Sequence, residues 1–189
     1  EGGQHVISTR STDRGRSWSK PIAVEPADGP EASYACLLKV QSGRIYCFYN
    51  YNGENTREIK TDPVGLPGYE GPDPYPDGIV RRVDSQGHFV FRYSDDNGLS
   101  WGTRRYRIPV RTMEIDRSNV YGGSIQFFWN VANPLVYNGA AYVSLHKVGG
   151  FGPGFFVRNE GVLLKSNNIL EEPDPEKIEW ETLPDGDIG

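Results

Sequence analysis

The sequence has 189 residues but only two cysteines and three histidines. His5, His88 and His146 lie far apart and have no metal-ligand spacing, so we expect neither a metal nor another cofactor. Cys36 and Cys47 fall on two strands joined by one turn, and the register decides whether they share a face of the sheet. We expect two buried free thiols, because a disulfide tolerates only a narrow geometry.

Long apolar runs, basic runs and helical periodicity are also missing. No run of eighteen apolar residues is present, so we expect no segment that spans a membrane. The net charge of −5, with mixed signs, argues against nucleic acid as the main partner. The 23 glycines, 14 prolines and 12% aromatic residues suit many short strands joined by turns. The sequence therefore predicts an all-β protein.

Two stretches repeat the pattern Ser-x-Asp-x-Gly-x-Ser-Trp, each between two strand-like runs. Such a stretch predicts the corner of a β-hairpin, because a turn Asp accepts backbone N–H groups and Gly supplies a positive φ. The Trp is expected to pack its ring on the sheet and donate its indole N–H to a carbonyl. Two complete matches indicate an internal repeat with a structural role. The residues are Ser11, Asp13, Gly15 and Trp18, and again Ser94, Asp96, Gly98 and Trp101.

This repeat resembles the Asp box, or BNR repeat, of the sialidase (neuraminidase) family. The resemblance implies a β-propeller of four-stranded blades, six in the family, with each box on the face away from the active site. It also implies an arginine triad around the sialic acid carboxylate, a Tyr nucleophile paired with Glu, and an Asp acid/base. The stretch Tyr106-Arg107-Ile108-Pro109 matches the family's Phe/Tyr-Arg-Ile-Pro motif, although it follows the second box. Arg107 is therefore a candidate ligand-binding residue.

The boxes, used as markers, indicate that residues 1–189 are part of a single propeller domain covering about two and a half blades. The expected parts are the end of one blade (1–24), a complete blade (31–110) with an insertion (52–87), the next blade (128–182), and a segment that enters a further blade (183–189). Two and a half blades cannot close a ring. We therefore expect the rest of the propeller to come from a longer chain.

Loop lengths distinguish the two rims of this array. The turns at one rim are short, as at 41–43 and 137–139. The connections at the other rim are long: 52–87, 111–127 and 149–161. Long loops raised on a rigid scaffold are where binding and catalysis usually occur. The Pro- and Gly-rich part of the first loop, 61–78, is interpreted as a lid or a surface arm.

One long loop gathers six polar side chains within eleven residues. Arginine forks bind carboxylates, and a carboxylic acid in a partly apolar pocket can protonate a glycosidic oxygen. Asp116 is the first choice for this acid and Glu114 the second, and Tyr121 is a further catalytic candidate. The candidate substrate-binding residues of this loop are Arg111, Arg117 and Asn119. The alternative is a solvated network of ion pairs.

Other candidates are expected at the same rim. Tyr34, Trp129 and Asn130 enter inner strands, where aromatic faces could form a platform for sugar C–H surfaces. For the aromatic residues the alternative is ordinary core packing. Glu31 and His146 are further substrate-binding candidates near the rim.

The most concrete hypothesis is a secreted sialidase-like glycoside hydrolase, extracellular or periplasmic, that acts on terminal acidic sugars of a glycan substrate. A second hypothesis is another carbohydrate-active propeller, such as a uronate polysaccharide lyase in which Tyr or His abstracts a proton α to the carboxyl group. A third is a non-catalytic propeller that binds glycan or protein, because one fold hosts many functions.

Overall fold

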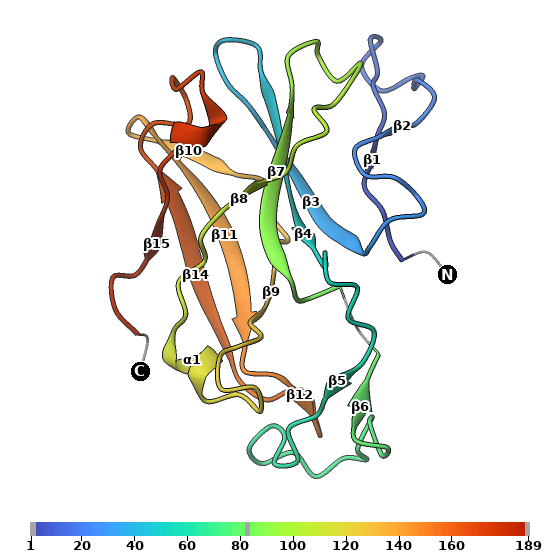
Figure 1. Ribbon diagram of the computed structural model, residues 1–189, viewed down its shortest axis with the longest axis vertical. Coiled ribbons are helices and arrows are strands. Elements are labelled where there is room, and N and C mark those ends of the chain that lie inside the picture. The colour runs from blue at the N-terminus through green and yellow to red at the C-terminus, as the bar shows by residue number, and fades with distance from the viewer. Residues whose placement is uncertain (1–2, 82–83, 188–189) are drawn as a thin grey trace.

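The computed structural model describes residues 3–81 and 84–187 and is all-β, as predicted. Its antiparallel sheets lie beside one another, and none closes into a barrel (Figure 1). Three of them form the body of the protein, and two small hairpins lie in the long loops. The helical elements among the described residues are α1 (Glu114–Arg117) and a 3₁₀ turn (Pro175–Lys177). No helix within those residues is long and apolar enough to cross a membrane.

The central sheet is a four-stranded antiparallel meander in the order β3-β4-β7-β8. Its strands are β3 (Ala32–Lys39), β4 (Ile45–Tyr51), β7 (His88–Ser94) and β8 (Tyr106–Arg107). The inner residues of β4 are buried on both faces, because a sheet packs on either side of it. The last of these strands has only two residues.

The third sheet has the path β10-β11-β14-β15, with β9 also paired to β11. Its strands are β9 (Phe127–Trp129), β10 (Leu135–Tyr137), β11 (Ala140–Val148), β14 (Asn159–Ser166) and β15 (Glu181–Leu183). Residues 128–136 do not form one continuous strand, because β9 and β10 pair with opposite ends of β11. Pro134 lies in the interruption and has no N–H to donate. The Asn130 side chain donates instead to the Ser144 carbonyl, at 2.7 Å.

The remaining strands are two residues long. The first sheet pairs β1 (Ile7–Ser8) with β2 (Ile22–Ala23), and the loop hairpins are β5 (Ile59–Lys60) with β6 (Ile79–Val80) and β12 (Phe151–Gly152) with β13 (Phe155–Phe156). The arm 61–78 is docked on the second hairpin, since the backbone N–H of Asp62 donates to the Phe151 carbonyl at 2.7 Å.

Two apolar cores hold the three main sheets together. The larger one lies between the central and third sheets and includes Phe48, Phe89 and Leu145. The smaller one lies between the first and central sheets. Cys36 belongs to the larger core and Cys47 to the smaller, because Cys47 is paired with Leu37 and so lies on the opposite face. Both thiols are free and buried, as predicted, and burial raises the pKa of Cys36 to about 12.

A buried carboxylate also links the first and central sheets. Glu25, which follows β2, is 1% exposed. Its oxygens accept hydrogen bonds from Arg105 at 2.6 and 2.7 Å, from Arg92 at 3.1 Å, and from the Tyr49 hydroxyl. Charge-assisted bonds to two arginines compensate the lost hydration of this carboxylate.

The two repeated stretches fold into the same turn. In the first, Asp13 accepts the backbone N–H of Ser17 at 2.9 Å and its hydroxyl at 2.6 Å. In the second, Asp96 accepts the same two groups of Ser100 at 2.9 and 2.5 Å. These hydrogen bonds, chiefly from the Ser17 hydroxyl, lower the pKa of Asp13 to about 2. The predicted role of Asp as a turn-former is therefore confirmed.

The expectation for the tryptophans is wrong in its detail. Trp18 is 62% exposed. Trp101 is half-buried, and its indole N–H donates to the Ser8 hydroxyl at 2.9 Å, on the neighbouring first sheet. Trp180, close to the start of β15, similarly packs edge-on against Phe48 of the central sheet. Each of these two rings thus packs against the adjacent sheet, and Trp18 has no such sheet beside it among the described residues.

Both repeated turns lie at one end of the protein, whereas α1 and the hairpins of the long loops lie at the other (Figure 1). We call the latter the loop-bearing end. This separation follows from the up-and-down order of the strands, which places alternate connections at opposite ends.

Candidate functional site

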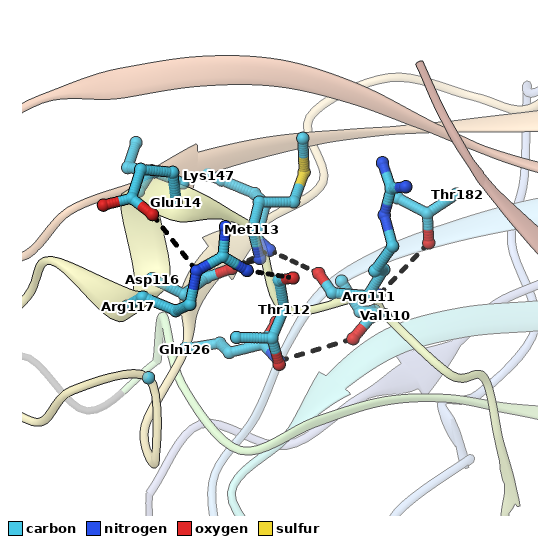
Figure 2. A network of polar contacts seen from close by, with 12 residues as sticks. Val110, Arg111, Thr112, Met113, Glu114, Asp116, Arg117, Gln126, Lys147 and Thr182 are labelled. Atoms are coloured by element: carbon cyan, nitrogen blue, oxygen red, sulfur yellow. Dashed lines mark hydrogen bonds and ion pairs between the residues drawn. The ribbon is translucent and has the colours of Figure 1, made fainter. Parts of the chain in front are cut away.

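Asp116 lies at the loop-bearing end but is completely buried. Its carboxylate forms an ion pair with Lys147 of β11, and both side chains are 0% exposed (Figure 2). The same Asp116 oxygen accepts the backbone N–H of Met113 at 2.7 Å and so caps α1. In this conformation Asp116 holds α1 on the third sheet and cannot reach a glycosidic oxygen.

Lys147 is enclosed by polar groups from three elements. It donates to Asp116 and to the Arg111 carbonyl, the latter at 2.9 Å. Glu160 of β14 lies directly opposite it in the register. Burial lowers the pKa of Lys147 and raises the pKa of Glu160. Both shifts show that charge is costly here, since desolvation disfavours the ionised form of each group.

Three charged side chains of this loop form the exposed network that was the alternative interpretation. Arg117 pairs with Glu114 at 3.1 Å (Figure 2). It also pairs with Asp187 at 2.7 Å. Arg111 donates to the carbonyls of Pro184 and Gly186. These contacts fasten the segment after β15 to the loop.

Asn119 and Tyr121 organise the same loop. The Asn119 amide donates to the Ile125 carbonyl at 2.8 Å, and its oxygen accepts the backbone N–H of Tyr121 at 2.8 Å. The Tyr121 hydroxyl accepts the backbone N–H of Lys60 at 2.7 Å. Each of the six predicted side chains of this loop thus has a partner within the protein.

A second group of predicted residues comes together as an aromatic cluster, which we define as Tyr34, Trp129, His146 and Phe156. Tyr34 stacks on Trp129 with ring centroids 6.2 Å apart. The His146 ring is nearly parallel to the same indole, at 4.8 Å and 13°. Phe156, from β13, lies 5.2 Å from Trp129. The members come from β3, β9, β11 and β13, so the cluster exists only in the folded protein.

Tyr34 is held in an unusual backbone conformation. Its φ is +58°, and it lies where the register of β3 and β4 shifts between Ser33 and Cys36. Its hydroxyl donates to the Asp84 carboxylate at 2.7 Å. Phe155, beside the cluster, has a φ of +79°. A positive φ is rare for bulky residues, and such outliers gather at functional sites.

Two other predicted residues support backbone near the cluster. Glu31 is buried and accepts the Ser33 hydroxyl at 2.9 Å and the backbone N–H of Gln4 at 3.0 Å. Asn130 is buried and, besides its bond to Ser144, accepts the backbone N–H of Ala132 at 2.9 Å. Both therefore shape the site rather than line it with free polar groups.

An open groove of about 380 Å³ runs beside Tyr34. It is lined by residues 34–36 of β3 and by 130–133, the segment that interrupts the first strand of the third sheet. The groove follows the inner edges of two neighbouring sheets. It therefore offers an extended ligand direct access to Tyr34.

Arg107 lies elsewhere. It is exposed on β8, the outermost strand of the central sheet, whereas Tyr34 is on β3, the innermost. The structure thus does not bring Arg107 together with the aromatic cluster.

Sequence reasoning did not identify Asp84, which lies near the end of the insertion 52–87 in a segment with no recognisable pattern. Its role depends on a contact with a residue fifty positions earlier. Among residues 3–81 and 84–187, no group of three His, Cys, Asp or Glu side chains could hold a metal ion.

Neither a scan against models of known protein families nor a search of curated proteins finds a match for this chain. The function is therefore argued from the site.

Proposed function

We propose that this chain is part of a sialidase-like propeller that hydrolyses terminal acidic sugars of glycans outside the cell or in the periplasm. The observation that carries the proposal is the hydrogen bond between Tyr34 and Asp84 in the aromatic cluster. The turns that resemble Asp boxes support the propeller, because they lie at the end opposite the long loops (Figure 1).

The exposed outer faces of the end sheets support a larger array. Leu135 and Tyr137 on the third sheet, and Trp18 after the first, are large apolar side chains open to solvent. Covering these side chains would remove apolar surface from water, which is favourable. Further sheets at both faces would cover it, as the central sheet is already covered on both sides.

The Tyr–carboxylate pair suits an acidic sugar. A carboxylate nucleophile would be repelled by the sugar's own carboxylate, whereas a neutral phenol is not, and tyrosine nucleophiles are known among glycosidases. Asp84 accepts the phenolic proton as the Tyr34 oxygen bonds to the anomeric carbon and the glycosidic bond breaks. Asp84 thus takes the role of the Glu that the family resemblance implies.

The leaving oxygen needs a proton from another group. His146 is the candidate donor, because its Nε2 is buried without a hydrogen-bond partner and its ring contacts Trp129, as Tyr34 does. Asp116 could serve only after α1 separates from Lys147, which would expose both charges.

The same two groups favour a uronate polysaccharide lyase as the second candidate. Tyr34 or His146 would then abstract the proton α to the uronate carboxyl group, and the product would be an unsaturated sugar. No hydrolytic water is needed in that reaction. The two candidates therefore differ in product and not in the residues that they use.

A substitution at Tyr34 tests the proposal. Tyr34→Phe keeps the ring and removes the nucleophile, so turnover of a fluorogenic sialoside should fall at least about a thousandfold, as on loss of other covalent nucleophiles. The protein should stay folded, since a hydrogen bond to a carboxylate contributes about 1.5–3 kcal/mol, less than the stability of a typical domain. Tyr137→Phe, at an exposed tyrosine, is the matched control.

Full sialidase activity of Tyr34→Phe would refute the role of Tyr34. If the unsubstituted protein releases no fluorophore but produces unsaturated uronates from uronate polymers, the lyase candidate replaces the hydrolase.

A further inference from the structure

A partly open cavity of about 140 Å³ lies at the loop-bearing end, away from the aromatic cluster. It is formed where the ends of β4, β7 and β8 meet the loop that precedes β9. Its lining comes from four segments: 52–56, 86–89, 107–110 and 123–128. Since β8 is the outer strand of the central sheet, this cavity is distinct from the groove beside Tyr34 on the inner strand.

Arg107 lines this cavity with a guanidinium group that has no partner among the described residues. It forms no hydrogen bond or ion pair with any residue that the structure describes. Apart from Arg14 and Arg16 in the first repeated turn, every other described arginine side chain has a carboxylate, carbonyl or hydroxyl partner. An arginine fork without a protein partner is free to take a planar anion by two parallel hydrogen bonds.

Gln126 supplies an acceptor. Its amide nitrogen donates to the Val110 carbonyl at 3.3 Å and to the Thr112 hydroxyl at 2.9 Å, which fixes the orientation of the amide. Its oxygen is left buried without a partner. A buried acceptor without a partner is costly, and a ligand hydroxyl would remove that cost.

The other lining groups suit a ring with both polar and apolar faces. Phe89, Ile108 and Phe128 form a buried apolar floor. Burial and the charge of Arg107 lower the pKa of His88, so its imidazole is neutral at pH 7 and can both donate and accept. Glu54 adds a carboxylate acceptor at the mouth.

We propose that this cavity binds a single six-membered sugar ring that carries a carboxylate. The carboxylate pairs with Arg107, ring hydroxyls donate to the Gln126 oxygen and Glu54, and a C–H face lies on Phe89 and Ile108. A cavity of about 150 Å³ is known to hold one benzene ring, so this cavity encloses part of the larger sugar and its open side leaves the remainder in solvent. This site is additional to the reacting site, and it rests on the proposed function only for the choice of an acidic sugar.

Binding of glucuronate, followed by isothermal calorimetry or by NMR shifts at low ionic strength, tests the inference. Glucose lacks the carboxylate and acetate lacks the ring, so each should bind at least tenfold more weakly than glucuronate. Arg107→Ala should weaken glucuronate binding at least tenfold, and Arg107→Lys should restore only part of it, because lysine keeps the charge and loses the fork. Arg16→Ala is the matched control, since it removes an unpaired arginine at the opposite end.

Unchanged glucuronate affinity in Arg107→Ala would overturn the inference, and so would equal binding of acetate and glucuronate. Tyr34→Phe separates this test from that of the proposed function, because it should leave glucuronate binding at the cavity unchanged. Binding that depends on Arg107, in a protein that turns over neither sialosides nor uronate polymers, would refute the proposed reaction and support the inferred site.

Discussion

Replacing Asp116 by Asn should destabilise the protein strongly, although the sequence alone suggested a catalytic acid at this position. Asn keeps the shape of Asp and can still accept the N–H of Met113. It removes the carboxylate that pairs with Lys147, whose side chain is fully buried. Lys147 would then retain the Arg111 carbonyl and the nearby charge of Glu160.

The expected loss is about 3–5 kcal/mol at pH 7, the usual cost of breaking a buried ion pair by removing one partner. This is a large part of the 5–15 kcal/mol that typically stabilises a domain. Burial already lowers the pKa of Lys147, so the loss should shrink as the pH rises from that lowered pKa towards 10.5. In this window the unfolded chain binds more protons at Lys147 than the folded protein does, and stability therefore rises with pH.

Urea unfolding of Asp116→Asn, Lys147→Met and the double variant, at pH 7 and at pH 9.5, measures these changes in the free energy of unfolding. The double variant should be destabilised by less than the sum of the single variants, by about 2 kcal/mol or more, since removing both charges leaves none unpaired. Glu114→Gln, at an exposed carboxylate of the same helix, is the control and should change stability by about 0.5 kcal/mol or less. If Asp116→Asn unfolds like the parent protein, the pair is not buried in solution and Asp116 is available as an acid.

Three other outcomes are expected. The carboxyl carbon of Asp13 should titrate by NMR with a pKa of about 2, and Ser17→Ala should raise this pKa. Because the folded pKa lies below the unfolded value, the stability that this group contributes should be lost as the pH falls from 3.8 towards 2. An ordinary pKa for Asp13 would contradict the turn geometry. Glu25→Gln should lower the free energy of unfolding, measured with urea, by about 3–5 kcal/mol, since it leaves two arginines without their shared carboxylate. A decrease below about 1 kcal/mol would count against the buried network. Trp101→Ala should lower stability by about 1–2 kcal/mol because its half-buried ring packs on the first sheet, whereas Trp18→Ala should change it by less than about 0.5 kcal/mol.

The repeated turns could be predicted because the hydrogen bonds that shape them are local. Asp13 and Asp96 bond to residues within four positions, so the eight-residue pattern contains the whole motif. The interruption of 128–136 could not be predicted in the same way. Pro134 indicated an interruption of the strand, but the break also depends on the hydrogen bond from Asn130 to a carbonyl of another strand.

The polar loop 111–121 shows what local sequence cannot predict. Its six candidates are close in sequence, and the structure keeps them close, but their partners come from distant segments. One signal was nevertheless present: Ala141, Val143 and Leu145 alternate on a buried face of β11, and a period of two places Lys147 on that face. A lysine on a core face needs a carboxylate, and Asp116 is the residue that supplies it.

We propose that stability and ligand recognition depend on different ends of the same strands. At one end, Ser and Asp side chains satisfy their own turns, and the free energy gained does not depend on any ligand. At the other, Tyr34 holds a strained φ, and His146 and Gln126 keep buried polar atoms without partners. Each of these features lowers the stability of the unliganded protein, and each is relieved or used when a polar ligand arrives. A ligand of the loop-bearing end should therefore raise the melting temperature, and substitutions in the repeated turns should leave the size of that rise unchanged.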